Sequence, residues 1–211
     1  ASNGKADRNT PKKVGKIDAR FDENGAYQIT ASYCMVNGRK MQVQYRTDPQ
    51  VSDEILLAAI LYAEAGGERQ TALFATLNQE TIRVYKGQLA VGYTILNRMA
   101  SRSYPSTVKE IVYAQYQFEP ARTGVLTALL KDQTRISTEC RNTAKLLLKD
   151  YKAAQDSVKE FPRSEFTWCN FWALSYARNY SDFFSVYKKN EYQIIGNQVF
   201  FNYTKTIHSQ S

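Results

Sequence analysis

The sequence predicts an α+β protein that is mostly α-helical, with a small β-hairpin near its N-terminus. Three observations predict this class: apolar residues alternate with polar ones over residues 27–45, later stretches carry apolar residues at helical spacing, and hydroxyl side chains precede those stretches as N-caps. The length of 211 residues and the hydrophobic content of 43% suit one domain with an appended hairpin, and the core needs no disulfide staples.

The N-terminal part divides into two segments. Residues 1–24 are polar and show no apolar period, which predicts a flexible leader. Residues 27–33 and 41–45 alternate between apolar and polar, and Asn37-Gly38 between them accepts the positive φ of a tight turn. We therefore expect a β-hairpin extension over residues 25–48, which packs on the main body or forms a small accessory module.

The main domain is expected over residues 49–204. Ser52-Asp53-Glu54 is typical of a helix start, and this helix is expected to continue to Glu64 and to stop at Gly66-Gly67. Further helices are expected at about 70–84, 87–99, 106–113 and 138–152, the last of these within a helical insertion near 120–162. Residues 205–211 are expected to form a frayed tail.

Charge and aromatic content narrow the class of ligand. The chain has 28 Lys and Arg against 20 Asp and Glu, and the resulting net charge of +8 implies a polyanionic partner such as nucleic acid, membrane headgroups or an anionic cell-wall polymer. The 15 Tyr and 10 Phe suit ligands with flat faces, meaning sugars or bases.

The cysteine and histidine content excludes several kinds of site. Cys34, Cys140 and Cys169 are too few and too widely spaced for a disulfide framework or a zinc site, although one disulfide with one free thiol stays open. His208 is the only histidine, which argues against catalytic triads and histidine metal sites. We expect no metal, no cofactor and no membrane span, and chemistry that uses carboxylates, Tyr or Lys.

Glu64 is the first candidate catalytic residue. It falls in the last turn of its expected helix, where exposed carbonyl groups disfavour an ionised acid, and burial among apolar neighbours would raise its pKa further. A carboxylic acid that keeps its proton near neutral pH can act as a general acid on a glycosidic oxygen. The alternative is a solvated glutamate followed by an ordinary Gly-Gly helix end.

Five motifs extend this observation along the chain. They are Glu64-Ala65-Gly66-Gly67-Glu68, the run from Gly87 to Arg98 (GQLAVGYTILNR), Tyr104-Pro105-Ser106-Thr107-Val108, Ile111-Val112-Tyr113 with Gln117-Phe118, and the run from Ile195 to Phe201 (IGNQVFF). Their content and order resemble the cell-wall hydrolase family typified by spore cortex-lytic enzymes. The resemblance implies a lysozyme-like helical fold, peptidoglycan as substrate, and lytic transglycosylase or muramidase chemistry with Glu64 as the acid.

The remaining candidates are weighed against structural roles. Glu-Ala-Gly-Gly also looks like the Glu-Ser-Gly-Gly of resuscitation-promoting factors, which favours Glu64 over Glu68 as the acid. Glu68 is a candidate second carboxylate, with a loop or capping role as the alternative, and Glu119 is a weaker third acid. Candidate substrate-binding residues are Tyr116, Gln117, Phe118, Trp168, Asn170 and Asn197, whereas Trp172 fits a core stripe and Asn97-Arg98 a structural role.

The sequence thus predicts a peptidoglycan-cleaving enzyme, most simply a lytic transglycosylase that uses one glutamic acid on the MurNAc–GlcNAc bond. A muramidase-type hydrolase is the alternative on the same bond. The rivals from other classes are a non-catalytic wall-binding or structural protein and a basic nucleic-acid-binding protein, although no nucleic-acid motif occurs. Glycan strands, with anionic wall polymers beside them, are the expected partners, and the expected location is extracellular, in the cell wall or periplasm, or on a phage particle.

Overall fold

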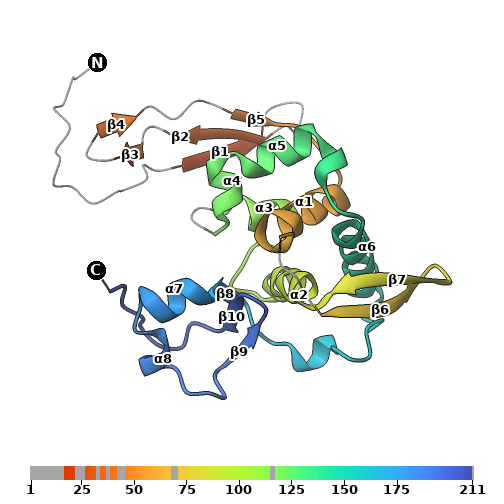
Figure 1. Cartoon of the computed structure of the whole chain (residues 1–211). Coiled ribbons are helices and arrows are strands. Elements are labelled where there is room, and N and C mark those ends of the chain that lie inside the picture. The colour runs from red at the N-terminus through yellow and green to blue at the C-terminus, as the bar shows by residue number, and fades with distance from the viewer. Residues whose placement is uncertain are drawn as a thin grey trace.

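The computed structural model describes residues 17–21, 27–31, 34–36, 39–41, 46–67, 71–114 and 117–210 (Figure 1). More of these residues lie in helices than in strands, and the strands pair only in small antiparallel sheets, which confirms the predicted α+β, mostly α class. The helices are α1 (Asp53–Ala65), α2 (Lys86–Ala100), α3 (Val108–Val112), α4 (Glu119–Thr123), α5 (Val125–Lys131), α6 (Thr138–Ala153), α7 (Leu174–Asn179) and α8 (Phe183–Val186), with 3-10 turns η1 (Gln133–Arg135) and η2 (Arg163–Glu165).

Short strands form the N-terminal part. In one antiparallel sheet the strands lie in the order β1 (Ile17–Phe21), β2 (Tyr27–Ala31), β5 (Arg46–Asp48), and β3 (Cys34–Val36) pairs with β4 (Arg39–Met41). Val36 pairs with Arg39, so only Asn37 and Gly38 separate these two strands along the chain. This register agrees with a hairpin at the predicted dipeptide.

Two expectations for this part need correction. Strand β1 falls inside residues 1–24, the predicted leader, because residues 17–21 themselves alternate between apolar and polar. Residues 1–16 lie outside the described part of the chain. The segment 27–33 was expected to pair with 41–45, but β2 pairs instead with β1 and β5, and β3 and β4 lie between β2 and β5 along the chain. The strands on either side of the predicted Asn37-Gly38 turn are therefore shorter than predicted.

Asp48 attaches this sheet to the helical body. Its side chain, at the end of β5, is fully buried, and its carboxylate accepts hydrogen bonds from the hydroxyls of Tyr113, at 2.6 Å, and Thr127. Tyr113 directly follows α3 and Thr127 belongs to α5. The two hydrogen bonds satisfy a buried charge that would otherwise be costly, so the N-terminal extension packs on the main body.

The main core forms where α1, α2 and α6 pack together. Figure 1 shows α2 in the middle of the molecule, and it contacts α1, α6 and the C-terminal strands. At the α2–α6 crossing a Cβ on Gly92 would overlap Leu147, so glycine permits this close approach. Leu146 and Leu147 are fully buried. Helix α6, predicted at 138–152 within an insertion, therefore belongs to the core.

The prediction of a helix over residues 70–84 is wrong. The chain forms a hairpin there, of strands β6 (Ala72–Leu77) and β7 (Glu80–Tyr85), joined at Asn78 and Gln79 with φ of 50° and 70°. Burial alternates along β6, with Leu73, Ala75 and Leu77 inside. An alternating apolar face is satisfied by a strand and not by a helix, which is the physical reason for the error.

A second antiparallel sheet carries the C-terminal part. Its order is β8 (Asn170–Ala173), β10 (Gln198–Phe201), β9 (Tyr192–Ile195). Along β10 the side chains alternate, so Phe200 packs in the main core while Val199 and Phe201 join a separate cluster with Phe183 and Tyr187. This sheet therefore stands between two apolar cores, and α7 and α8 cover the smaller one.

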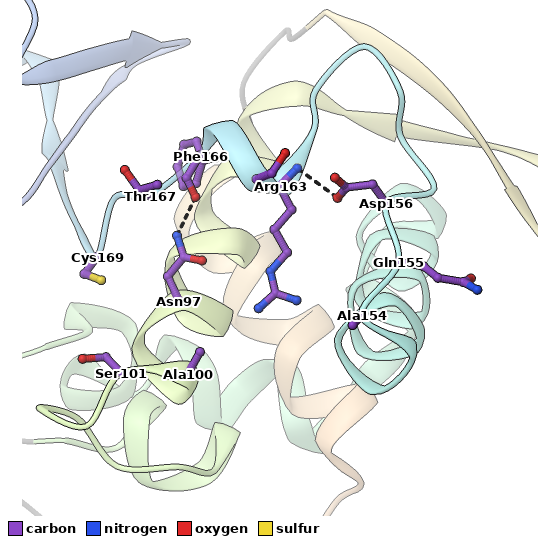
Figure 2. Close-up of a pocket in the computed structure, with 11 residues that line it drawn as sticks. Asn97, Ala100, Ser101, Ala154, Gln155, Asp156, Arg163, Phe166, Thr167 and Cys169 are labelled. Carbon is purple, nitrogen blue, oxygen red and sulfur yellow. Dashed lines mark hydrogen bonds between the residues drawn. The ribbon is translucent and has the colours of Figure 1, made fainter.

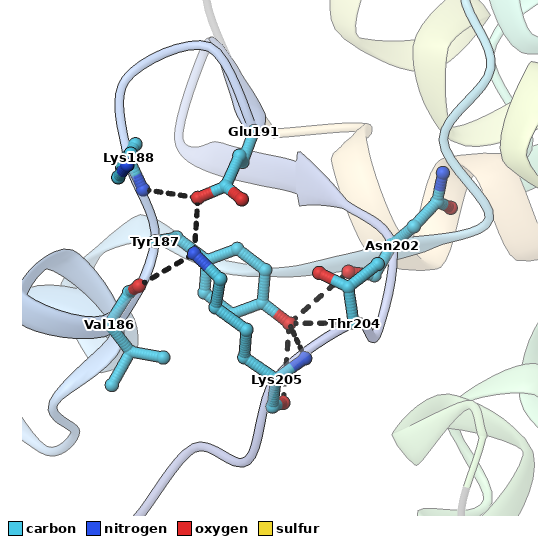
Figure 3. Close-up of polar contacts among 7 residues, drawn as sticks. All are labelled: Val186, Tyr187, Lys188, Glu191, Asn202, Thr204 and Lys205. Atoms are coloured by element: carbon cyan, nitrogen blue, oxygen red, sulfur yellow. Dashed lines mark hydrogen bonds and ion pairs between the residues drawn. The ribbon is translucent and has the colours of Figure 1, made fainter.

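The C-terminal segment is hydrogen-bonded instead of frayed. The Tyr187 hydroxyl accepts from the backbone N–H groups of Thr204 and Lys205, both at 3.2 Å, and it lies within hydrogen-bond distance of two carbonyls (Figure 3). Lys205 Nζ forms a 2.5 Å ion pair with Glu191 Oε2. Further on, the N–H of His208 donates to Asp182 at 2.7 Å. The tail predicted at 205–211 is thus corrected for the residues described there.

Candidate active site

Helix α1 holds Glu64 at its C-terminal end. The Ser52 hydroxyl caps the helix by accepting from the Ile55 N–H at 3.3 Å, and the first turn carries Asp53 and Glu54. Its last turn carries no basic residue. Glu64 therefore lies next to the negative end of the helix dipole with no cation on its own helix to stabilise the ionised form.

Gly66 closes this helix for a steric reason. Its N–H donates to the Tyr62 carbonyl at 2.8 Å, and a Cβ at this position would lie 2.7 Å from Tyr62 Cδ2. A Cβ on Gly67 would meet nothing within 4 Å. Of the predicted glycine pair, Gly66 is thus the one that the geometry requires, and it sets the helix end two residues after Glu64.

The environment of Glu64 favours the protonated acid. Burial, together with a smaller contribution from the negative charge of Glu119, raises the pKa of its carboxyl group to about 7. Burial is the larger cause because an ionised carboxylate loses hydration that a neutral acid needs far less. At neutral pH a substantial fraction of Glu64 therefore carries a transferable proton, as the sequence analysis expects of a general acid.

Glu64 lines a cavity of about 600 Å³ together with the C-terminal sheet and α7. The cavity offers a carboxyl group, amides, a hydroxyl and a guanidinium beside apolar surface, which is the mixture found where polar ligands with apolar faces bind. The other lining residues are Phe171, Ala173, Leu174, Ser175, Arg178, Asn179, Asn197 and Gln198.

Gln198 is a residue of this cavity that the sequence analysis did not single out. Its Nε2 donates to the backbone carbonyl of Glu64 at 3.4 Å, and the side chain is 5% exposed. Its Oε1 is buried without a hydrogen-bond partner among the described residues. A buried acceptor with no partner is costly, so a donor supplied by a bound molecule is its natural complement. Its place in the Ile195–Phe201 motif was the available signal.

The structure separates the predicted substrate-binding residues into different environments. Asn197 lines the cavity with Glu64, and its carbonyl accepts from the Leu174 N–H at 2.8 Å. Phe118 is 3% exposed, with its ring 6.1 Å from that of Phe171, so it belongs to the core and presents no face to a sugar. Trp168 is half-buried and donates from Nε1 to Gln193 at 3.1 Å.

Arg98 gathers two more of these residues. Its guanidinium, buried with 4% exposure, donates to the carbonyl of Cys169 at 2.6 Å, to Gln117 Oε1 at 3.1 Å and to Asn170 Oδ1 at 3.4 Å. The rings of Tyr104 and Phe118 also lie beside it. Gln117 and Asn170 are therefore held by Arg98 and do not line the Glu64 cavity, which agrees with the structural role predicted for Asn97-Arg98.

Among the acids that the structure describes, Glu119 is the one whose charge acts on Glu64. It is the first residue of α4, exposed, and 3.4 Å from Arg122. Glu68 and Tyr116 lie outside the described residues. Trp172 packs among aromatic rings of the smaller core, within 5.5 Å of Phe201, as predicted for a core residue.

The described residues include no metal-binding cluster and no membrane-spanning helix. No group of three or more His, Cys, Asp or Glu in that part of the chain is arranged to hold a metal ion. Among the residues that the structure describes, no helix combines the length and apolar character that a bilayer crossing requires.

Comparison with known proteins defines the class. The sequence profile of the Cell Wall Hydrolase family matches residues 83–201, more than half of the 211 residues, and the chain belongs to this family. Glu64 lies ahead of the matched range. A comparison with curated proteins finds no match. Among solved structures, the chain is similar to the catalytic domain of the germination-specific lytic transglycosylase SleB from Bacillus anthracis, with 22% identity over 74% of this chain and 98% of that one and a TM-score of 0.41.

Proposed function

We propose that this member of the Cell Wall Hydrolase family is a lytic transglycosylase that cleaves the MurNAc–GlcNAc bond of peptidoglycan, with Glu64 as general acid and then general base. The observation that carries the proposal is the place of Glu64: a carboxyl group with a pKa of about 7 in the wall of a cavity of about 600 Å³. Such an acid can protonate a leaving oxygen at neutral pH and can take a proton back afterwards.

The proposed reaction uses one carboxyl group twice. Glu64 gives its proton to the bridging oxygen while the bond from that oxygen to C1 of the muramyl sugar breaks, which leaves positive charge on the sugar ring. The Glu64 carboxylate then accepts the proton of the C6 hydroxyl of the same sugar as its oxygen bonds to C1. The products are a free hydroxyl on one strand and a 1,6-anhydro end on the other, and Glu64 is again protonated.

Hydrolysis by a muramidase route is the second candidate, and Glu119 is the observation that favours it. A hydrolase needs a second carboxylate, at about 5–5.5 Å for retention or about 6.5–9.5 Å with a water between for inversion. The charge of Glu119 acts on Glu64, so both acids belong to one electrostatic environment. Glu119 is exposed and paired with Arg122, and neither feature raises its nucleophilicity, so we favour the one-acid route.

Product ends separate these routes. Purified sacculi are digested with the protein, and the released fragments are identified by mass spectrometry. Anhydro ends are the expected result, reducing ends would replace the proposal by hydrolysis, and an absence of fragments would reject both. The last outcome, with retention on the wall that falls steeply with salt, would favour the non-catalytic wall-binding or nucleic-acid-binding alternatives.

The role of Glu64 is tested by Glu64→Gln, which keeps the shape and removes the transferable proton. Activity is expected to fall by about 100-fold or more, since general acid catalysis typically supplies about 10²–10⁴. Glu160→Gln, at an exposed glutamate, is the matched control and should digest wall at the parent rate. Full activity of Glu64→Gln would refute the assignment.

A site of action outside the cell, at the wall or delivered by a phage particle, follows from this substrate.

A further inference from the structure

A second cavity, of about 470 Å³, opens at the C-terminal end of α2 and shares no lining residue with the Glu64 cavity. Its walls come from the last turn of α2, from the segment that follows α6, and from residues 163–169 (Figure 2). A volume of this size is ordinary for a small-molecule site. Nothing in the proposed reaction uses it.

Arg163 supplies the positive charge of this cavity. Figure 2 shows its side chain extending from η2 into the space between α2 and α6. The guanidinium lies 5.2 Å from the ring of Tyr151, and among the described residues no carbonyl or carboxylate accepts from its N–H groups. A guanidinium with unused donors matches a planar carboxylate, which it can bind through two parallel hydrogen bonds.

Asp156 supplies a negative charge to the same cavity. One of its oxygens, Oδ1, accepts from the backbone N–H of Arg163 at 2.9 Å, which fixes the two residues relative to each other (Figure 2). The Asp156 carboxylate and the Arg163 guanidinium form no ion pair in the described structure. The two charges therefore stay available to a ligand, and a carboxylate in the cavity disfavours a phosphate dianion by repulsion.

The rest of the lining is neutral. The Asn97 amide is already used, since its Nδ2 donates to the carbonyls of Phe166, at 2.8 Å, and Trp168, at 3.1 Å. One helical turn before Asn97, the hydroxyl of Tyr93 is fully buried without a hydrogen-bond partner, and the charges of Asp156 and Arg163 both act on it. Tyr93 itself does not line the cavity, so the groups that a ligand can reach there are the two charges and the neutral residues around them.

We propose that this cavity binds a zwitterionic amino-acid group, with its carboxylate on Arg163 and its ammonium on Asp156. The inference rests on the proposed function for its source, because an uncrosslinked diaminopimelate in a peptidoglycan stem peptide carries both charges on one carbon. The cavity would then hold the peptide of a strand whose glycan is cleaved at Glu64.

Cys169 provides a readout that needs no activity. It is a half-buried free cysteine that lines this cavity, whereas Cys140 is fully buried. In a Cys34→Ser background, the rate of alkylation of Cys169 is measured with and without free diaminopimelate, and a ligand in the cavity is expected to slow it. Three other compounds should protect about tenfold less well: pimelate, cadaverine and glycerol phosphate. Pimelate lacks the amino groups and cadaverine lacks the carboxylates, so each can pair with only one of the two charged side chains. Glycerol phosphate carries the wrong charge.

Variants assign the two charges. Arg163→Gln and Asp156→Asn should each weaken protection by diaminopimelate about tenfold, and Asn keeps the oxygen that accepts from the Arg163 N–H. Arg135→Gln, at an exposed arginine outside the cavity, should leave protection unchanged. Protection by glycerol phosphate equal to that by diaminopimelate, no protection at all, or full protection in Arg163→Gln would overturn the proposal.

The test of this cavity is independent of the test of the proposed function. Glu64→Gln should bind diaminopimelate as the parent does, since Glu64 does not line this cavity. A protein that protects Cys169 but releases no wall fragments would retain the zwitterion site and lose the transglycosylase assignment. A protein that releases anhydro fragments without protection would do the reverse.

Discussion

At the scale of single residues, Glu64 combines two opposing demands. In the proposed reaction its burial keeps a transferable proton on the acid. The same burial destabilises the folded protein whenever the carboxyl group ionises, because the pKa is raised from an ordinary 4.5 to about 7. The folded state then binds more protons than the unfolded state between these two values. Stability associated with Glu64 is therefore present below about pH 4.5 and is lost as the pH rises through 7.

This linkage predicts a pH-dependent stabilisation by Glu64→Gln. The neutral amide has no ionised form to bury, so at pH 8 the variant should melt roughly 2–4 °C above the parent, and at pH 4 the two should melt together. Thermal unfolding followed by circular dichroism measures both. Glu160→Gln, at an exposed site, should show no such difference at either pH. An equal gain at pH 4 and pH 8 would mean that ionisation is not its cause.

Gln198 yields a second prediction at this scale. Replacing it by Met removes a long hydrogen bond to the Glu64 carbonyl and also removes a buried acceptor without a partner, so the two effects on stability largely cancel. We expect unfolding by urea within about 0.5 kcal/mol of the parent and a loss of wall digestion of about tenfold. A variant with parent activity would show that Oε1 accepts nothing from the substrate.

The sequence could indicate Glu64 as a candidate because its signal is local: a helix end, two glycines and no basic residue in the last turn of the helix. Arg98 and Gln198 could not be assigned in this way, since their partners lie at positions 117 and 170 for the first and 64 for the second. Phe118 shows the reverse case. A ring beside a motif looks available in the sequence, but only the packing against Phe171 decides that it is buried.

At the scale of elements, capped helices were predictable and the β6–β7 hairpin was not. Helices α1 and α6 begin directly after Ser52 and Ser137. Each of these hydroxyls accepts a hydrogen bond from the N–H of the third residue after it. The hairpin turns at Asn78-Gln79, which lacks the glycine that usually marks positive φ, and β6 exposes Phe74 at 64%, which hides its alternation. For these reasons the sequence of this segment predicts a helix, although the segment forms strands.

The end of α1 predicts a difference between two neighbouring glycines. In Gly66→Ala the new methyl group would press against Tyr62, so the last turn must shift, and we expect a cost of about 1–3 kcal/mol together with reduced activity, because Glu64 lies in that turn. Gly67→Ala meets open space and should stay within about 0.5 kcal/mol of the parent. Urea unfolding and wall digestion measure both variants, and equal effects would contradict the steric argument.

The C-terminal segment gives a prediction for a local contact. Tyr187→Phe removes the hydroxyl that accepts from the N–H groups of Thr204 and Lys205, which should loosen this segment by about 1–3 kcal/mol without unfolding the main core. Amide hydrogen exchange at Thr204 and Lys205 should therefore speed up by about tenfold or more. Tyr192→Phe in the same aromatic cluster is the control, since no hydrogen bond of its hydroxyl occurs in the described structure. Slow exchange in Tyr187→Phe would assign the segment's order to apolar packing.

At the scale of the whole molecule, the net charge of +8 and the Glu64 cavity act over different distances. Attraction between exposed charges is screened beyond about 10 Å at 0.1 M salt, whereas contacts inside a cavity are screened much less. Retention on walls that carry anionic polymers should accordingly fall about tenfold or more between 50 and 300 mM NaCl, while turnover of short soluble glycan fragments changes less than about threefold. Co-sedimentation with sacculi and fragment release measure the two quantities. Walls stripped of their anionic polymer are the control, and retention that is equally salt-sensitive on stripped walls would move the attraction from that polymer to the peptidoglycan itself.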